Sequence, residues 1–203
     1  MEKIDYKKQY KDIYIAKKKP QIIDVEAYKY ICVEYLGNPN NEQFNDVMKA
    51  LYSMSYTVKM KSKNLKDYYD YVVFPLEGYW TLQDPSKGLN KDNFKSIMMI
   101  RQPDFLNEQL FEDYKKIIKL KNSENSYIDK LELKEITEGL SIQMLHVGPY
   151  DTEVETFSIM QEFAEKNNLE RSSLNHKEIY LSDPRKTAPE KLKTTLRFSV
   201  KAK

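Results

Sequence analysis

The sequence predicts an α+β fold made of two copies of a β-α-β-β unit, with antiparallel strands in a sheet and helices on one face. The first observation is a repeat: residues 30–37 (YICVEYLG) align with residues 141–148 (SIQMLHVG) and share an isoleucine and a final glycine. The second is that each copy continues into residues with the apolar spacing of a helix. Such a duplication usually joins two halves about a pseudo-two-fold axis, and the central groove between them suits a small molecule.

The first copy begins with a strand that ends at Gly37. Asn38-Pro39 then offers an N-cap followed by a proline at the first helical position, and Asp104 offers the cap of a later helix. In chain order we expect strand 28–36, helix 38–56, strand 71–76 leading into a turn at 76–80, strand 96–101, helix 104–118 and a polar linker at 121–130.

The second copy repeats this order with a longer turn. Strand 140–147 leads into a turn that contains Tyr150, and Thr152 with Glu155 forms the capping box of the next helix. The last two strands are expected at residues 178–181 and 195–200. Short connections and consecutive strands favour an antiparallel sheet.

The domain organisation follows from the position of the repeat. Residues 1–27 are polar and form an N-terminal lead-in that is too short for a helical DNA-reading module. Residues 28–203 are expected to form a single domain of two half-repeats, at about 28–120 and 131–203.

The composition excludes several classes of partner. The 203 residues carry a net charge of +2 with 32% charged residues, which favours neither nucleic acid nor a membrane surface. No apolar run approaches the roughly 20 residues that span a bilayer, and the N-terminus lacks the apolar core of a signal peptide. The single cysteine, Cys32, fits a reducing compartment. We expect a cytoplasmic protein that is a monomer or weak homodimer.

Metal and cofactor chemistry is not expected. His146 and His176 are the only histidines, and no spaced set of histidine, cysteine and carboxylate residues is present. The 5 glycines form no phosphate-binding loop. The sequence therefore predicts no metal and no cofactor.

Aromatic residues are abundant, with 16 Tyr, 8 Phe and 1 Trp. Tyrosine combines a flat apolar ring with a hydroxyl, which suits both core packing and a ligand site. Tyr79 and Trp80 follow a turn glycine, where a ring either folds over a cleft mouth or caps the core. Tyr150 lies in the longer second turn, either as a hydrogen-bond donor to a ligand or as a rim tyrosine.

Four segments carry a resemblance to a known family. Residues 178–197 (EIYLSDPRKTAPEKLKTTLR) closely resemble the C-terminal signature of stand-alone GyrI-like small-molecule-binding proteins. Residues 75–80 (PLEGYW), 99–105 (MIRQPDF) and 146–151 (HVGPYD) match the same family. The resemblance implies a curved antiparallel sheet and two long helices around a central aromatic ligand cleft. Relatives tend to carry further tryptophans, whereas Trp80 is the only one here.

The family includes ligand-sensing domains of multidrug-responsive regulators, gyrase-inhibitory proteins, and hydrolases that open the cyclopropane ring of alkylating toxins. The chain resembles the hydrolase branch, the cyclopropanoid cyclopropyl hydrolases. The implied function is binding of a planar hydrophobic or cationic small molecule, with possible hydrolysis of a cyclopropane-bearing toxin for detoxification. The alternatives are a non-catalytic drug-binding or sensing protein and a gyrase-modulating interaction protein.

Glu178 is the first candidate for chemistry. The resemblance implies a pocket glutamate at this position, and strand alternation places Tyr180 on the same face. A carboxylate among aromatic rings can act as a general base toward water or as the counter-ion of a cation. The alternative is a surface glutamate on an edge strand. Tyr150 is the expected electrophilic partner. The expected ligand-binding residues are Tyr35, Tyr79, Trp80, Met99, Met144, His146 and Tyr180.

Overall fold

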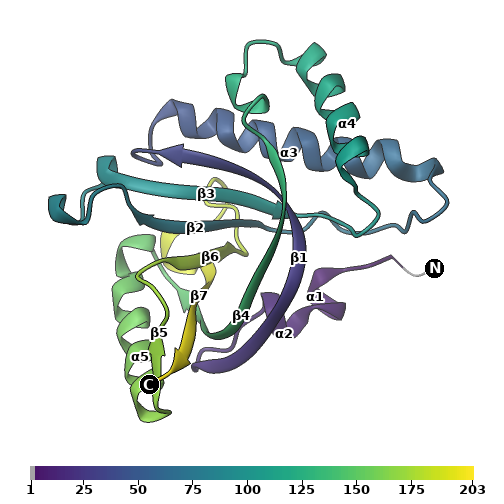
Figure 1. The fold of residues 1–203 in the computed structure, drawn as a ribbon. Coiled ribbons are helices and arrows are strands. Elements are labelled where there is room, and N and C mark those ends of the chain that lie inside the picture. The colour runs from purple at the N-terminus through teal and green to yellow at the C-terminus, as the bar shows by residue number, and fades with distance from the viewer. Residues whose placement is uncertain (1–2) are drawn as a thin grey trace. The chain divides into compact units, whose positions relative to one another are not determined.

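The computed structural model describes residues 3–203, and Figure 1 shows the course of the chain. The helices are α1 (Tyr6–Gln9), α2 (Lys11–Tyr14), α3 (Glu42–Lys61), α4 (Glu108–Lys121) and α5 (Glu153–Lys166). The strands are β1 (Gln21–Leu36), β2 (Leu76–Leu82), β3 (Phe94–Arg101), β4 (Glu132–Val147), β5 (Leu169–Arg171), β6 (His176–Tyr180) and β7 (Lys193–Ala202).

The chain divides into two compact units that each draw on separate stretches of sequence. The first unit comprises residues 28–74 and 81–136, with the described residues before Tyr6. The second unit comprises residues 6–27, 75–80 and 137–203. The strands β1, β2 and β4 each run from one unit into the other. The units therefore do not coincide with successive halves of the sequence.

The first unit is built on the antiparallel pair β1–β3. Its register runs from Tyr30 opposite Arg101 to Leu36 opposite Lys95. The helix α3 packs against β3 and lies along it in Figure 1. Helical spacing explains this contact, because the fully buried side chains of α3 recur on one face. They are Val47, Ala50, Leu51, Met54 and Val58.

The second unit is built around β7, which pairs with β4 on one side and with β6 on the other. Leu196 of β7 lies opposite both Met144 and Glu178, which fixes the two registers. The strand β2 pairs with the free side of β6, and β5 pairs with the last residues of β7. All of these pairs are antiparallel. Side chains at opposing positions point to the same face, so each register defines which residues meet.

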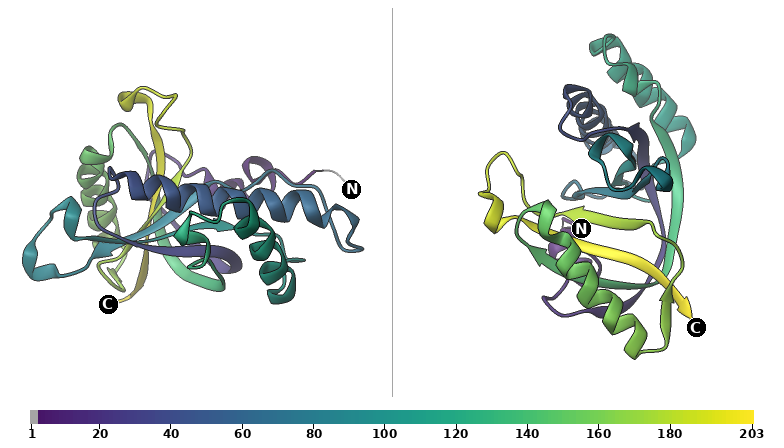
Figure 2. Two further views of the ribbon diagram at one scale, coloured as in Figure 1. Left: turned by 90° about the horizontal axis from the view of Figure 1, so that it is seen from above. Right: turned by 90° about the vertical axis from the view of Figure 1, so that its left-hand side faces the viewer.

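One face of this sheet is covered by α5, as the right panel of Figure 2 shows. The apolar cluster beneath the helix contains Ile142, Met144, Met160, Ala164, Leu169, Leu196, Phe198 and Val200. Burying a leucine, isoleucine, methionine or phenylalanine side chain contributes roughly 1.5–3 kcal/mol. This face also carries Glu178, which sits near the first turn of α5.

The opposite face is contacted by α2, in the segment 6–27. The Thr195 hydroxyl donates to the Tyr14 carbonyl at 2.8 Å, and Gln143 Nε2 donates to the Asp12 carbonyl at 2.7 Å. Below this segment lies a group of buried charges that we call the charge quartet: Glu77, Glu138, Lys177 and Arg197. The four side chains form buried ion pairs on this face of the sheet.

Within the charge quartet, Lys177 Nζ lies 2.6 Å from Glu77 and 2.7 Å from Glu138, and Arg197 Nη1 lies 2.8 Å from Glu138. Burial alone would raise the pKa of Glu138, but the charges of Lys177 and Arg197 lower it to about 2. The two acids and two bases thus balance each other away from water.

The predicted α+β class with antiparallel strands is confirmed, and several element boundaries differ. The strand β1 starts at Gln21, inside the stretch expected to be a lead-in, and β4 starts at Glu132 instead of residue 140. The helix α3 starts at Glu42, because Asn38 closes a turn: its side chain accepts from the Asn40 amide at 3.0 Å. The cap of α4 is Asn107, whose side chain accepts from the Leu110 amide at 2.9 Å, and not Asp104.

The glycines matched in the sequence repeat occupy the same place in the structure. Gly37 follows β1 before α3, and Gly148 follows β4 before α5. Their φ angles are 113° and 143°, a region that side-chain-bearing residues rarely adopt. The repeat therefore reflects a turn that both copies need at the end of the strand.

Candidate functional site

Glu178 lies on β6 and is 8% exposed. Its carboxylate accepts from the hydroxyl of Tyr180 at 2.8 Å through Oε2 and contacts Nε2 of His176 at 3.0 Å through Oε1. All three residues lie on one face of the same strand, because side chains alternate along it. The strand alone thus places a phenol and an imidazole against the two oxygens of one carboxylate.

Trp80 extends this network from the neighbouring strand. It lies opposite His176 in the β2–β6 register, and its Nε1 donates to the Tyr180 hydroxyl at 2.8 Å. The indole N–H, the phenol and the Glu178 carboxylate therefore form a continuous chain of hydrogen bonds. Burial and the charge of Glu178 raise the pKa of Tyr180 well above its ordinary value, so the phenol stays neutral.

Tyr150 approaches the same phenol from the turn before α5. Its ring is perpendicular to that of Tyr180, with centroids 6.0 Å apart. Burial, together with the charge of Glu178, raises the pKa of Tyr150 to about 12. The residue is 38% exposed, so part of it is accessible to a molecule from solution.

Glu153, the first residue of α5, is a member of this cluster that the sequence did not reveal. Its side chain is 6% exposed, and its buried Oε1 has no hydrogen-bond partner among residues 3–203. Burial and the charge of Glu178 raise its pKa. In the sequence an acidic residue in the first turn of a helix indicates only a favourable interaction with the helix dipole. Its place in the cluster depends on where α5 crosses β6, which no local pattern encodes.

We call Trp80, Tyr150, Glu153, His176, Glu178 and Tyr180 the Glu178 cluster. His176 is the second member that the sequence analysis did not select. The alternation that placed Tyr180 beside Glu178 also applies two residues earlier in the strand, so that signal was available. All six residues belong to the second unit.

Met144 and His146 lie on the same face of the sheet as Glu178, but Met144 packs in the apolar cluster and His146 holds the turn after β4. Met144 belongs to the apolar cluster under α5. His146 Nδ1 lies 2.9 Å from the Thr156 hydroxyl, and its Nε2 lies 3.1 Å from the Pro149 carbonyl. The imidazole therefore ties the end of β4 to α5. A direct role of either residue in ligand binding stays a prediction.

Tyr79 is adjacent to Trp80 in sequence but points to the opposite face of the sheet. Its ring lies 5.0 Å from Nζ of Lys177, within the charge quartet. Burial raises the pKa of Tyr79 above its usual range. The structure thus separates the two aromatic residues that the sequence analysis had grouped.

Tyr35 and Met99 belong to the first unit. Met99 is fully buried opposite Cys32. The Tyr35 hydroxyl donates to the Asn38 carbonyl at 2.9 Å, and its ring packs edge-on against Phe44 at 5.1 Å. Tyr35 thereby holds the turn before α3, the position that His146 occupies in the second copy.

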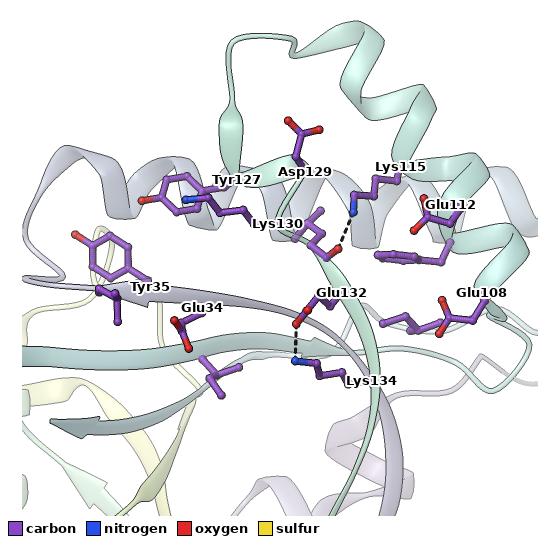
Figure 3. Close-up of a pocket in the computed structure, with 15 residues that line it drawn as sticks. Glu34, Tyr35, Glu108, Glu112, Lys115, Tyr127, Asp129, Lys130, Glu132 and Lys134 are labelled. Atoms are coloured by element: carbon purple, nitrogen blue, oxygen red, sulfur yellow. Dashed lines mark hydrogen bonds and ion pairs between the residues drawn. The ribbon is translucent and has the colours of Figure 1, made fainter. Parts of the chain in front are cut away.

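Tyr35 also lines a hollow of about 1000 Å³ in the first unit, drawn in Figure 3. The end of β1, the helix α4 and residues 127–134 form its walls. The view shows Tyr35 and Tyr127 on one side and the carboxylates of Glu108 and Glu112 on the other. No member of the Glu178 cluster lines this hollow.

Metal binding finds no support in the described structure. Among residues 3–203, no group of three or more histidine, cysteine, aspartate or glutamate side chains is arranged to hold a metal ion. In the same residues, no helix is both long and apolar enough to cross a membrane.

Chemically, the Glu178 cluster offers a partly shielded negative charge beside aromatic rings and neutral hydroxyl donors. A carboxylate has about four acceptor positions, so contacts with Tyr180 and His176 leave capacity for a further donor or cation. Aromatic rings next to such a charge favour a flat or cationic organic molecule.

A family model described as the GyrI-like small molecule binding domain matches residues 18–201 of the chain. The match covers both compact units. None of the curated proteins matches the sequence.

Solved structures from Listeria innocua are similar over nearly the whole chain. An uncharacterized conserved protein is 37% identical, with a TM-score of 0.91, and the alignment covers 98% of this chain and 100% of that one. A hydrolase from the same organism is 36% identical, with a TM-score of 0.89 and the same coverage. The C-terminal domain of EcmrR, at 14% identity and a TM-score of 0.56, covers 94% of this chain and 99% of its own, and shares the fold.

Proposed function

The chain belongs to the GyrI-like family of small-molecule-binding domains, and from this premise we propose that the Glu178 cluster is its ligand site. The ligand class we infer is a planar hydrophobic molecule with a cationic or electrophilic centre. The observation that carries the proposal is one buried carboxylate that accepts from Tyr180, a residue that in turn contacts Trp80 and Tyr150. Aromatic faces and a negative charge together select this class.

The proposed reaction is hydrolysis of a cyclopropane-bearing alkylating toxin. Support comes from the similarity to a Listeria innocua hydrolase over 98% of this chain. The oxygen of water would bond to a ring carbon while a carbon–carbon bond of the cyclopropane breaks. The released electron pair moves to the conjugated oxygen of the toxin, which takes up a proton, and the proton of the water is accepted by a base.

Each member of the cluster has a role in this proposal. Glu178 accepts the proton of the attacking water. Tyr150 donates to the oxygen on which charge develops, because the hydroxyl of Tyr180 already donates to Glu178. Trp80 packs against the ring system and, through Tyr180, fixes the carboxylate.

A first experiment tests binding. A planar cationic dye should quench the emission of Trp80, the single tryptophan. Glu178→Gln removes the charge at nearly constant shape and should weaken the dye by about tenfold or more. Glu155→Gln is the matched control, because Glu155 is an exposed residue of α5. Equal affinity in the wild type and Glu178→Gln would contradict the site assignment.

A second experiment tests hydrolysis. Incubation with a spirocyclopropane alkylator should yield a product heavier by one water, detected by mass spectrometry. Glu178→Gln should abolish turnover, whereas Glu155→Gln should not. Recovery of the compound unchanged from the wild-type protein, despite quenching of Trp80, would exclude the hydrolase and leave the binding function.

Non-catalytic binding is the second candidate, and one observation favours it. Both oxygens of Glu178 already contact donor groups, Tyr180 and His176. These contacts leave fewer acceptor positions on the carboxylate for the proton of an attacking water. A carboxylate held in this way serves as the counter-ion of a bound cation without accepting a proton.

A further inference from the structure

His176 and Glu178 form a directly contacting pair on β6. Nε2 of His176 lies 3.0 Å from Oε1 of Glu178, and the His176 side chain is 25% exposed. An ionised carboxylate only accepts hydrogen bonds, so Nε2 carries a proton in this contact. A neutral His176 therefore keeps its lone pair on Nδ1, where a second proton would bind.

Two neighbouring elements hold the imidazole in this orientation. The ring of Phe157, on α5, meets it edge-on, with centroids 4.7 Å apart. Trp80 of β2 lies opposite His176 in the strand register. Both neighbours are uncharged, so they fix the ring without adding a charge to it.

Two charged groups act on the imidazole. Glu178 favours the charged form of His176 through direct contact. The guanidinium of Arg171, on β5, disfavours it from a position 5.9 Å from the centroid of Phe157. It is held there because it donates to two carbonyls of the loop before β6, at 3.0 and 3.1 Å. The other titratable side chains of the Glu178 cluster all have raised pKa values: Tyr150, Glu153 and Tyr180.

We propose that His176 is a positioning residue that selects the charge of the ligand accepted by the Glu178 cluster. A neutral His176 donates its Nε2 proton to Glu178 and leaves the negative charge of the carboxylate to a bound cation. A charged His176 forms an ion pair with Glu178, so the pair has no net charge and favours an uncharged ligand over a cation. This inference rests on the proposed ligand site and refines its ligand class.

Imidazole ¹⁵N NMR tests the pair without any ligand. The chain has 2 histidines, and His176→Gln assigns the signals because it removes those of one ring. Neutral His176 should carry its proton on Nε2, and Glu178→Gln should lower the pH at which this ring gains its charge. Glu155→Gln, at an exposed position of α5, should leave the titration unchanged. A proton on Nδ1 of the neutral ring, or the same titration in Glu178→Gln, would overturn the proposal.

Ligand binding provides a readout that a merely structural role would not move. Benzyltrimethylammonium keeps its charge at all pH values, and neopentylbenzene is its uncharged isostere. As His176 gains its charge, affinity for the ammonium should fall by about tenfold or more, because a positive charge then adjoins the carboxylate. The fall, followed through Trp80 emission, should coincide with the titration seen by NMR. Affinity for the hydrocarbon should stay constant.

The variants assign this effect to His176. The amide of His176→Gln offers an uncharged N–H donor in place of Nε2, so this variant should bind the ammonium at every pH about as tightly as the wild type with a neutral imidazole. Glu155→Gln should keep the pH dependence of the wild type. An equal fall in His176→Gln, or an equal fall for the hydrocarbon, would overturn the proposal.

The two experiments separate this inference from the proposed function. If the ammonium binds to no variant at any pH, the proposed site for cations fails, and the selection of ligand charge fails with it. The NMR titration still decides whether His176 and Glu178 are coupled. If the ammonium binds with an affinity that is independent of the charge of His176, the inference fails and the proposed site stands.

Discussion

The hydroxyl of Tyr180 connects two buried polar groups, the carboxylate of Glu178 and the indole of Trp80. It donates to Glu178 and accepts from the indole of Trp80, both at 2.8 Å. Removal of this one hydroxyl is therefore expected to change both the stability of the protein and the environment of Trp80.

Tyr180→Phe should therefore destabilise the protein by about 1–3 kcal/mol, because a donor and an acceptor are left buried without their partner. Denaturant unfolding measures this change, and Trp80 emission should shift in the folded state. Tyr56→Phe is the control, since Tyr56 is 54% exposed. A loss equal to that of the control would show that the phenol hydroxyl is not part of a buried network.

Glu153 should make stability depend on pH with a defined sign. Its folded-state pKa is raised above the ordinary value of 4.5. Its contribution to stability is thus fully present below about pH 4.5 and is lost as the pH rises through the folded-state pKa. The Glu153→Gln variant has no ionisable group at this position, so its stability does not decrease in this way.

The variant should consequently gain at least about 1 kcal/mol over the wild type between about pH 4 and about pH 8. Urea unfolding at the two pH values measures the gain, and Glu155→Gln serves as the reference for a surface glutamate. A gain that is the same at both pH values would contradict the raised pKa.

At this scale the sequence predicted part of the grouping of side chains, and their role as a ligand site stays a prediction. Glu178, Tyr180, Trp80 and Tyr150 lie together in the second unit. Tyr79 could have been separated from Trp80 by strand alternation alone, since adjacent residues in a strand face opposite sides. Glu153 could not have been found, because its place is set by how a helix lies across a sheet.

At the scale of elements, the charge quartet joins strands that are distant in sequence. Arg197 on β7 contacts Glu138 on β4 at 2.8 Å and also donates to the side chain of Gln143 at 2.8 Å. Removing one partner of a buried ion pair leaves a charge without compensation, which is far more costly than loss of a surface pair.

Arg197→Met should destabilise the protein by about 3–5 kcal/mol, measured by chemical denaturation. Lys201→Met on the same strand is the matched control, because its pair with Glu170 is exposed, and its effect should stay within about 1 kcal/mol. Similar effects of the two substitutions would show that the charge quartet is solvated.

Glu138 should make the stability of the folded protein decrease at acid pH. Its folded-state pKa is about 2, below the ordinary value of 4.5, so its contribution is present above about pH 4.5. That contribution is lost as the pH falls toward about 2. Thermal unfolding across this range should show a steep loss in the wild type. Glu138→Gln should flatten the loss, and an unchanged slope in this variant would contradict the assignment.

The helices and strands were predictable in type, and their ends were less so. The helix α3 continues past Tyr56 to include Val58. Valine is a poor helix former, but the side chain of Val58 is fully buried on the apolar face of α3, and this burial outweighs the low helix propensity. The strand expected at residues 71–76 lies instead at Leu76–Leu82, over the expected turn and after Pro75, which lacks the amide for a strand ladder. Tertiary burial decided the first case, and backbone chemistry the second.

At the scale of the whole molecule, each compact unit is assembled from distant parts of the chain. The second unit needs residues 6–27 and 75–80 besides residues 137–203. The sequence repeat indicated two halves, but it carried no signal for this exchange of segments, because the repeat aligns only the strand, turn and helix of each copy.

A fragment of residues 131–203 should therefore fail to fold alone. It lacks β2, the partner of β6, and the segment that covers the charge quartet. Co-expression with residues 1–130 should restore folded protein, judged by dispersed amide signals in NMR. A fragment that folds alone with dispersed signals would show that the half-repeat is self-sufficient.

The hydrogen bond from Thr195 to the carbonyl of Tyr14 spans 181 positions in the chain. Closing so long a loop delays the step that it completes, and non-local strand pairing is slow for the same reason. During synthesis, this contact cannot form until Thr195 of β7 has been added. Until then residues 6–27 lack one of the strands that they cover, so this early segment is expected to stay partly exposed through most of synthesis.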